Sequence, residues 1–280
     1  MFDSTKQSLR ELLQALKKGQ IQLPEFQRGW VWKNDQIKEL IASVIRQYPI
    51  GAVMLLEAGG EVRFQTRPVE GMQFASAPPP PELLILDGQQ RLTSMFQATL
   101  MGHAAQTENE RKQKVQRWYY LDIGRLLEEP DALEEAVIDV PADRIKPEVA
   151  GRPGLDLSTP ELEYQQKLFP LSKIYEASGW QTGYVKHWKD TNQFSEAFDI
   201  YTSFQDRVIN PFSEYQLPVI TLGRSSRREA VCQVFEKVNT GGVKLNAFEL
   251  VTASYAADGF DLRADWYGRK ARGEQTAIEG

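Results

Sequence analysis

Apolar and polar residues follow two different periods along this chain of 280 residues. Spacings of three and four residues, which place side chains on one face of a helix, recur in five segments. The first of these predicted helices has the pattern of a capping box, Ser4 with Gln7. The helices are expected to begin near Ser4, Asn34, Gln89, Ser225 and Asn246.

Shorter apolar runs between these segments predict β-strands. Two of them, 51–58 and 62–66, flank the pair Gly59-Gly60 and are typical of a hairpin. Further strands are expected over 83–86, 118–123 and 215–222. The predicted fold class is therefore α/β (α+β), with a mixed sheet as its core.

The order of these elements indicates a core that is interrupted by an insertion. Residues 1–124 and 214–258 supply the strands and helices of the core, whereas residues 125–213 are mainly helical and rich in loops. We interpret residues 259–280 as a C-terminal tail or as the start of a linker to a further effector domain.

Composition limits the chemistry that the chain can perform. With 41% hydrophobic and 25% charged residues it has the profile of a soluble domain, and no apolar run approaches a membrane span. The N-terminus has no secretory signal, and a single cysteine, Cys232, excludes an internal disulfide, so we expect a cytoplasmic location. The only histidines, His103 and His187, argue against zinc and against a Cys/His nucleophile.

Charge is unevenly distributed, although the net charge is only −5. Residues 128–163 hold eleven acidic against three basic residues, net −8. Residues 223–244 hold five basic against two acidic residues, net +3. The whole chain is therefore no basic nucleic-acid binder, but it contains a locally basic segment that suits phosphate.

The stretch LLILDGQQRLTSMF joins a short apolar strand to a helix through a polar turn. Backbone N–H groups at the start of a helix bind anions, and Gly88 lets a phosphate approach that backbone closely. Arg91 is placed to fork onto two phosphate oxygens, and Asp87 is placed to hold Mg²⁺ or orient a water. Two hydroxyl groups follow in the helix, those of Thr93 and Ser94, and they are further candidates for binding the phosphate.

The same motif has a purely structural alternative. Asp87 would then cap the helix, and Gln89, Gln90 and Arg91 would only cover its surface. The spacing alone does not decide between the two interpretations. It does exclude a Walker motif, because no Gly-Lys-Ser/Thr follows the glycine.

Aromatic and polar residues are concentrated in a second stretch, LPEFQRGWVW. Arg28, next to Gln27, is placed to act as a second phosphate clamp, and Trp30 and Trp32 are candidates for stacking on a base. The alternative is that the tryptophans pack on the core and Arg28 pairs with a carboxylate. We favour packing for at least one tryptophan and the phosphate role for Arg28.

A third stretch, VFEKVNTGGVKLNAFEL, contains a break after a predicted helix. Taken alone, Asn239 and the following glycines are typical of a helix C-cap. The functional alternative is that Asn239, Gly242 and the neighbouring backbone amides bind the ligand of the first two stretches.

Together, IQLPEFQRGWVW, LILDGQQRLTSMF and VFEKVNTGGVKLNAFELVTA resemble, in this order, the DUF262 family, the N-terminal domain of GmrSD-type restriction endonucleases. The resemblance spans about residues 5–258, and its Asp-Gly-Gln-Gln-Arg signature is specific. It implies a ParB/sulfiredoxin-like α/β domain that binds, and in several relatives hydrolyses, a nucleoside triphosphate. Such domains usually belong to bacterial anti-phage systems that act on modified DNA, often beside an HNH nuclease domain.

Site residues are implied by the same resemblance. The nucleotide or catalytic motif corresponds to Asp87, Gly88, Gln89, Gln90 and Arg91. The upstream element corresponds to Gln27 and Arg28, and the downstream element to Asn239 and Gly242. GTP or ATP with Mg²⁺ is then the expected ligand.

The chain departs from its relatives in two respects. After residue 258 the sequence is polar and contains no histidine, so we do not expect an HNH nuclease in this chain. Gln89 and Gln90 occupy the places where sulfiredoxin chemistry needs a cysteine, which excludes a thiol-phosphate reaction at this turn.

Three functional hypotheses remain open. The first is an NTP-hydrolysing regulatory domain that gates a partner nuclease in a restriction system. The second is a DNA-binding or DNA-nicking module, in which the same arginines contact DNA phosphate and residues 223–244 add positive charge. The third is an interaction domain that binds a nucleotide without hydrolysing it. The sequence leaves open the nucleotide, the DNA modification and the formation of a homo-oligomer.

Overall fold

A computed structural model gives the fold of the chain. It describes residues 2–25, 27, 29–30, 32–60, 64–129, 133–148, 153–226, 230–231 and 234. Three predicted site residues, Arg28, Asn239 and Gly242, lie outside the described residues, as do the predicted helix near Asn246 and residues 259–280.

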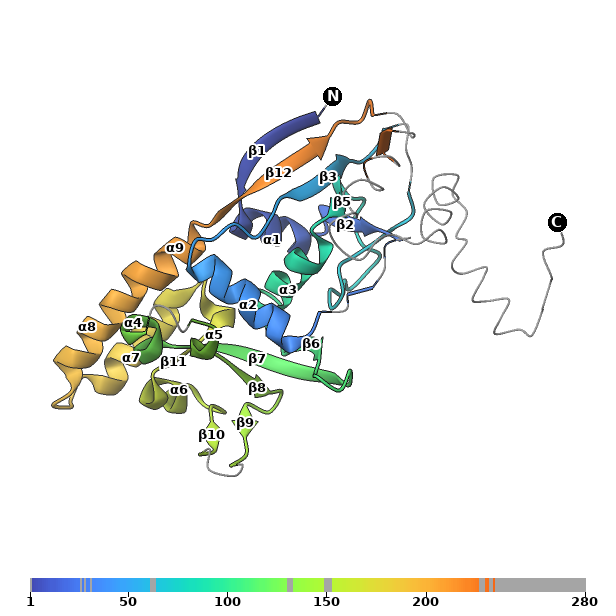
Figure 1. The fold of residues 1–280 in the computed structure, drawn as a ribbon. Coiled ribbons are helices and arrows are strands. Elements are labelled where there is room, and N and C mark those ends of the chain that lie inside the picture. The colour runs from blue at the N-terminus through green and yellow to red at the C-terminus, as the bar shows by residue number, and fades with distance from the viewer. Residues whose placement is uncertain are drawn as a thin grey trace, which may run out of the picture.

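A six-stranded mixed sheet forms the upper part of the molecule in Figure 1. Two neighbouring pairs are parallel, β12 with β3 and β2 with β5, and the other three pairs are antiparallel. This arrangement confirms the α/β class and the mixed sheet. The strand order is β1 (Phe2–Ser8), β12 (Gln216–Leu222), β3 (Val53–Glu57), β5 (Leu83–Asp87), β2 (Ile21–Pro24) and β4 (Thr66–Arg67).

Three helices accompany this sheet: α1 (Leu9–Lys17), α2 (Asn34–Ile45) and α3 (Gln89–Thr99). The apolar stripe of α1 is buried, and burial of a leucine side chain contributes about 1.5–3 kcal/mol. The predicted helices near Asn34 and Gln89 are confirmed, as are strands β5 and β12.

The predicted start of the first helix is wrong. Residues 2–8 form β1, which pairs with β12 along its whole length, and α1 begins only at Leu9. The Leu9 N–H donates to the Tyr215 carbonyl, and Ser8 makes no side-chain capping bond. A seven-residue antiparallel ladder satisfies more backbone groups than a capping box, which satisfies two N–H groups, so the long-range pairing prevails.

The predicted hairpin around Gly59-Gly60 is also wrong. Strand β3 lies between β12 and β5, and the segment after the glycines contributes β4, which pairs with β2 instead. Apolar side chains such as Val53 and Leu55 are completely buried in β3. A strand that is buried in this way gains more from two neighbours than from one hairpin partner.

A second sheet lies below the first in Figure 1, and β7 (Lys114–Asp122) is its central strand. It pairs with β6 (Ala105–Glu108), β8 (Val137–Pro141) and β11 (Leu168–Pro170). Strands from both sides of residue 124 therefore share this sheet. The division into a core and an insertion remains a prediction about domain organisation.

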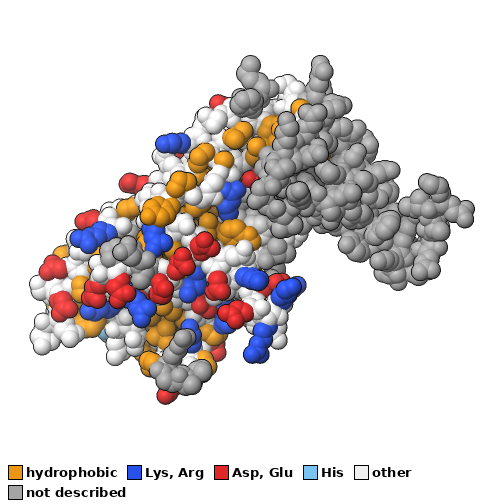
Figure 2. All heavy atoms as spheres, in the orientation of Figure 1, with side chains coloured by type: hydrophobic (Ala, Val, Ile, Leu, Met, Phe, Trp, Pro, Cys, Tyr) orange, Lys and Arg blue, Asp and Glu red, His pale blue; other side chains and the backbone are white. Residues whose placement is uncertain are grey.

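Between residues 123 and 213 the chain is mostly helical. The helices are α4 (Ile123–Glu128), α5 (Leu133–Ala136), α6 (Pro160–Gln166), η1 (Leu171–Lys173), α7 (Ala177–Trp188), α8 (Phe194–Phe204), η2 (Gln205–Ile209) and α9 (Asn210–Ser213), and a small ladder pairs β9 (Ile145–Lys146) with β10 (Leu155–Asp156). Figure 2 shows acidic and basic side chains interspersed over this half, so the acidic run creates no surface of one sign on the visible face. Within the described part, no helix is long and apolar enough to cross a membrane.

Aromatic rings fill the space between these helices and the second sheet. Trp180 lies 5.1 Å from Phe169 and 5.0 Å from Tyr184, measured between ring centroids, and Phe204 lies 5.4 Å from Phe169. Phe169 belongs to the same buried cluster as the leucines of α1. The two halves of the molecule therefore share one hydrophobic core.

A buried carboxylate, that of Glu163 in α6, borders this aromatic region. The Tyr120 hydroxyl donates to its Oε1 and the Trp180 indole N–H donates to its Oε2, both at 3.0 Å. Arg144 Nη1 approaches Oε1 at 3.4 Å. Burial nevertheless dominates and raises the pKa of Glu163 above its ordinary value.

Replacing Phe169 by alanine should destabilise the protein by about 3–5 kcal/mol, because it leaves a cavity in the shared core. Phe198→Ala is the matched control, since Phe198 is 44% exposed and should cost less than about 1 kcal/mol. Urea unfolding of both variants measures the difference. Equal losses would contradict a core that extends into β11.

The pKa of Glu163 predicts how stability depends on pH. A raised pKa means that Glu163 binds a proton more tightly in the folded than in the unfolded state. The stabilisation of the fold by this proton is therefore fully present below the ordinary pKa of 4.5 and is lost as the pH rises through the folded pKa. Glu163→Gln cannot titrate. The difference in Tm, wild type minus variant, should therefore decrease between about pH 4 and pH 7. A difference that is constant or increases with pH would contradict this assignment.

Candidate functional site

The polar motif lies where β5 passes into α3, as the sequence predicts. Asp87 ends the strand, Gly88 has φ +89°, and Gln89 begins the helix. A Cβ atom at Gly88 would lie 2.9 Å from Val53 Cγ2. Backbone angle and space thus both require glycine here, and the first N–H groups of α3 have no acceptor within the helix itself.

Arg91 reaches back from the first turn of α3 to the end of the α2–β3 connection. Its Nη1 donates to the Ile50 carbonyl, and its Nη2 donates to the Ala52 carbonyl at 2.9 Å and to Asp87 Oδ2 at 3.2 Å. The Arg91 and Asp87 side chains are 20% and 36% exposed, so the pair borders solvent. Among the described residues the Nε–H of Arg91 has no hydrogen-bond partner.

Tyr215, which the sequence did not indicate as a site residue, also binds the α2–β3 connection. The Tyr215 hydroxyl donates to the Tyr48 carbonyl at 2.7 Å and accepts from the Ile50 N–H at 3.3 Å. Burial raises the pKa of Tyr215, which keeps the hydroxyl protonated as a donor. Arg91 and Tyr215 therefore fix residues 48–52 between them.

Gly51 is a second requirement of this arrangement. Its φ is +88°, and a Cβ atom there would collide with Arg91 Nη1. The only signal in the sequence is the pair Pro49 and Gly51, which is typical of an ordinary turn. Its relation to Arg91 becomes visible only in three dimensions.

The first two sequence stretches meet at this turn. Gln27 is buried, and its Nε2 donates to the carbonyls of Ile85 and Leu86, the latter at 3.3 Å. Gln90 Nε2 donates to the Gly29 carbonyl at 3.3 Å. The segment before and after position 28 therefore lies against β5 and α3.

The remaining predicted site residues on α3 are buried. Gln89 is 7% exposed, and Thr93 and Ser94 are fully buried. Ser94 Oγ accepts a hydrogen bond from Trp30 Nε1 at 3.0 Å. Thr93 Oγ1 has no hydrogen-bond partner within the part of the chain that the structure describes. Phosphate contacts of these hydroxyls remain a prediction.

Trp30 and Trp32 both pack, partly buried, against the main hydrophobic cluster. The Trp30 indole also bonds Ser94, and the Trp32 carbonyl accepts from Thr107 Oγ1 at 2.9 Å. These contacts correspond to the packing alternative that the sequence left open for the tryptophans. Stacking of either ring on a base remains a prediction.

A metal site made only of protein ligands is not found in the described residues, where no three His, Cys, Asp or Glu side chains cluster. Mg²⁺ beside a nucleotide needs less, because phosphates and waters supply most of its ligands. Asp87 fits this role with Oδ1, since only its Oδ2 bonds Arg91 among the described residues.

Two comparisons with known proteins each match most of the chain. The family model described as GmrSD restriction endonuclease, N-terminal domain, matches residues 9–256. An uncharacterized protein of Methanocaldococcus jannaschii is 27% identical over 255 residues, which are 89% of this chain and 41% of that protein. The chain thus spans about two fifths of the length of this curated relative.

Gly51→Ala should destabilise the protein clearly more than Gly59→Ala. Both glycines have positive φ, near +88° and +81°, but a Cβ atom at Gly59 meets nothing within 4 Å. The strained backbone should cost about 1 kcal/mol in each variant, and displacement of Arg91 should add about 1–3 kcal/mol at position 51. Urea unfolding of the two variants measures the difference, and equal losses would contradict the role of Arg91 as a brace.

Proposed function

The chain belongs to the GmrSD restriction endonuclease N-terminal domain family, and on this premise we propose that it binds and hydrolyses a nucleoside triphosphate as a regulatory domain of a bacterial restriction system. The observation that carries the proposal is the strand–turn–helix at Asp87, Gly88 and Arg91, with the Gln27 segment packed beside it. A carboxylate, a glycine turn and a guanidinium meet there at one helix N-terminus.

Phosphate would bind at the start of α3, where the helix dipole and the backbone N–H groups favour negative charge. Arg91 offers its Nε–H and its second Nη1 hydrogen without leaving the carbonyls of Ile50 and Ala52. Arg28 is proposed as a second clamp on the same phosphates. A guanidinium that is already fixed costs little rotamer entropy when it binds.

Hydrolysis requires a water in line with the terminal phosphorus. The water oxygen forms a bond to phosphorus while the bond to the bridging oxygen of the nucleoside diphosphate breaks. Asp87 would orient this water or hold Mg²⁺ through Oδ1, and the water's proton would pass to Asp87 or to solvent. When bound, Mg²⁺ would neutralise charge on the phosphates.

The partners belong to the same proposal. The family description names a restriction endonuclease, and the curated relative extends well beyond the matched region. We propose that nucleotide turnover gates an HNH-type nuclease, present as a further domain or a separate subunit, and that the system acts on modified phage DNA in the cytoplasm.

One observation favours a related alternative, a domain that binds the nucleotide without hydrolysing it. Asp87 already bonds Arg91 through Oδ2. If this ion pair persists with nucleotide bound, Asp87 is less able to accept a proton, and the domain would act as a switch.

Phosphate release from GTP and from ATP tests the proposal. Asp87→Asn should reduce the rate about 100-fold or more while leaving nucleotide binding, and Arg91→Ala should abolish both. Arg10→Ala is the matched control, because the Arg10 guanidinium also donates to a backbone carbonyl, that of Tyr175, but on α1. Thermal melting of each variant separates loss of fold from loss of chemistry.

Unchanged phosphate release in both motif variants would overturn the NTPase proposal. If the wild type binds a nucleotide but does not hydrolyse it, the non-hydrolysing switch would be favoured. Nicking of modified or unmodified plasmid that needs no nucleotide, yet fails in Arg91→Ala, would favour the DNA-nicking hypothesis instead.

A further inference from the structure

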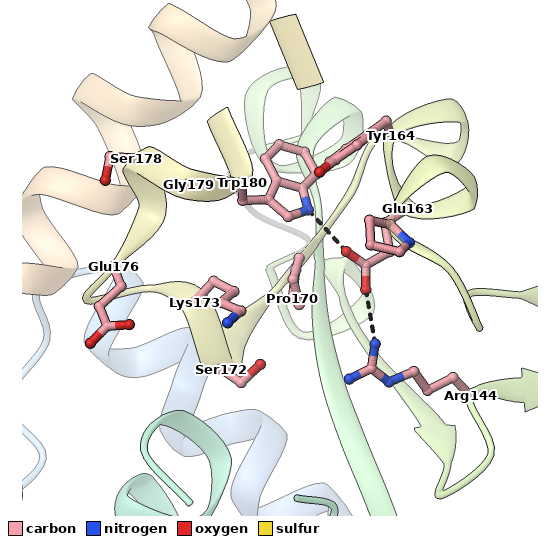
Figure 3. Close-up of a pocket in the computed structure, with 11 residues that line it drawn as sticks. Arg144, Glu163, Tyr164, Pro170, Ser172, Lys173, Glu176, Ser178, Gly179 and Trp180 are labelled. Atoms are coloured by element: carbon pink, nitrogen blue, oxygen red, sulfur yellow. Dashed lines mark hydrogen bonds and ion pairs between the residues drawn. The ribbon is translucent and has the colours of Figure 1, made fainter. Parts of the chain in front are cut away.

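A pocket in the helical half of the molecule is lined by residues of α6, η1 and α7 and shares no residue with the β5–α3 turn. Its volume is about 590 Å³, within the range of small-molecule sites. Figure 3 shows the residues that line it. They include Arg144, Glu163, Tyr164, Ser172, Lys173 and Trp180.

The inner wall of the pocket is a completed hydrogen-bond network. Glu163 accepts from Tyr120, Trp180 and Arg144, and only 3% of the residue is exposed. Two neutral donors and one cation thus share its negative charge. The carboxylate is occupied by protein groups, and its effect on the pocket is to orient Arg144 and the Trp180 edge.

Arg144 is held in an unusual position for a non-glycine residue. Its φ is +63° at the end of the Pro141–Arg144 turn, a conformation that carries a steric cost. In return the guanidinium lies over the Trp118 ring at 4.5 Å and beside Glu163 at 3.4 Å. Its Nε and Nη2 have no hydrogen-bond partner among the described residues, so part of the fork remains available.

Lys173 and Ser172 lie on the opposite side of the pocket from Arg144 in Figure 3. Lys173 is exposed and makes no ion pair with any described residue. Glu176 and Ser178 also line the pocket and supply oxygen acceptors. Two cations, Arg144 and Lys173, and two carboxylates, Glu163 and Glu176, therefore line the pocket together with the rings of Tyr164, Trp180 and two prolines.

We propose that this pocket binds one nucleotide unit of a DNA strand. The phosphate would lie between Arg144 and Lys173, with the Ser172 hydroxyl as a third donor. The sugar or base would lie against Tyr164 and Pro170, and Glu176 with Ser178 would accept from its amino or hydroxyl groups. The choice of DNA rests on the proposed restriction function, whereas the nucleotide chemistry rests on the pocket.

Because the pocket lies apart from the β5–α3 turn, DNA binding and nucleotide hydrolysis would take place at different sites. A nucleotide unit bound between α6 and α7 leaves the β5–α3 turn open for a triphosphate. The helical half would then contact DNA while the motif at Asp87 turns over its own nucleotide.

Lys173→Ala and Lys173→Glu test the proposal with the full chain and labelled DNA, single-stranded and duplex, in fluorescence anisotropy without triphosphate. Lys173→Ala should weaken binding roughly fivefold and lower the slope of log K against log salt by about one, because one phosphate contact is lost. Lys173→Glu should weaken it further. Lys189→Ala, an exposed lysine at the end of α7 outside the pocket, is the matched control and should bind as the wild type does.

A free nucleoside monophosphate, titrated by calorimetry into the same variants, shows whether the pocket binds a free nucleotide or a nucleotide unit of a DNA strand. Weaker binding of the monophosphate alone would assign the pocket to a free nucleotide, and weaker binding of DNA would assign it to a strand. The proposal is overturned if Lys173→Ala and Lys173→Glu match Lys189→Ala toward both probes. Arg144→Lys, which keeps the charge but not the fork, should show an intermediate loss.

Phosphate release from GTP or ATP without DNA should be unchanged in the Lys173 variants. The two proposals can therefore fail separately. A chain without NTPase activity can still lose DNA affinity at Lys173, and an active NTPase can lack any Lys173 effect on DNA.

Discussion

The guanidinium of Arg91 is the contact on which the geometry of the candidate site depends. It connects the first turn of α3 to two carbonyls of the α2–β3 connection and to the last residue of β5. Gly51 and Gly88 leave the space that this side chain and its turn occupy. Arg91, which the motif indicates as a ligand contact, thus also fixes the backbone around the candidate site.

Local signals in the sequence predict the elements that depend mainly on residues nearby in the chain. The turn at Gly88 and helices α2 and α3 follow from periodicity and turn residues within a short window. The errors at Ser4 and at Gly59-Gly60 have a common cause, because both segments contain strands whose partners lie far along the chain. Short-range patterns cannot weigh a hydrogen-bonded ladder that forms at long range.

The candidate site divides in the same way. Its motif could be identified from side chains, since Asp87, Gly88 and Arg91 carry the chemistry themselves. The acceptors of Arg91 could not, because backbone carbonyls at Ile50 and Ala52 leave no trace in residue identity. Tyr215 was missed for a related reason, since one tyrosine before a strand looks like any other aromatic residue until its hydroxyl is placed at Tyr48 and Ile50.

The antiparallel ladder between β1 and β12 has a consequence for how the chain is made. Phe2 pairs with Leu222, so β1 leaves the ribosome some two hundred residues before its partner strand has been synthesised. Contacts of such high sequence separation form slowly, and until then one edge of the sheet is exposed on the nascent chain. The domain that contains the Asp-Gly-Gln-Gln-Arg motif can therefore close only after synthesis has passed β12, which ties the completion of its fold to the end of translation of this region.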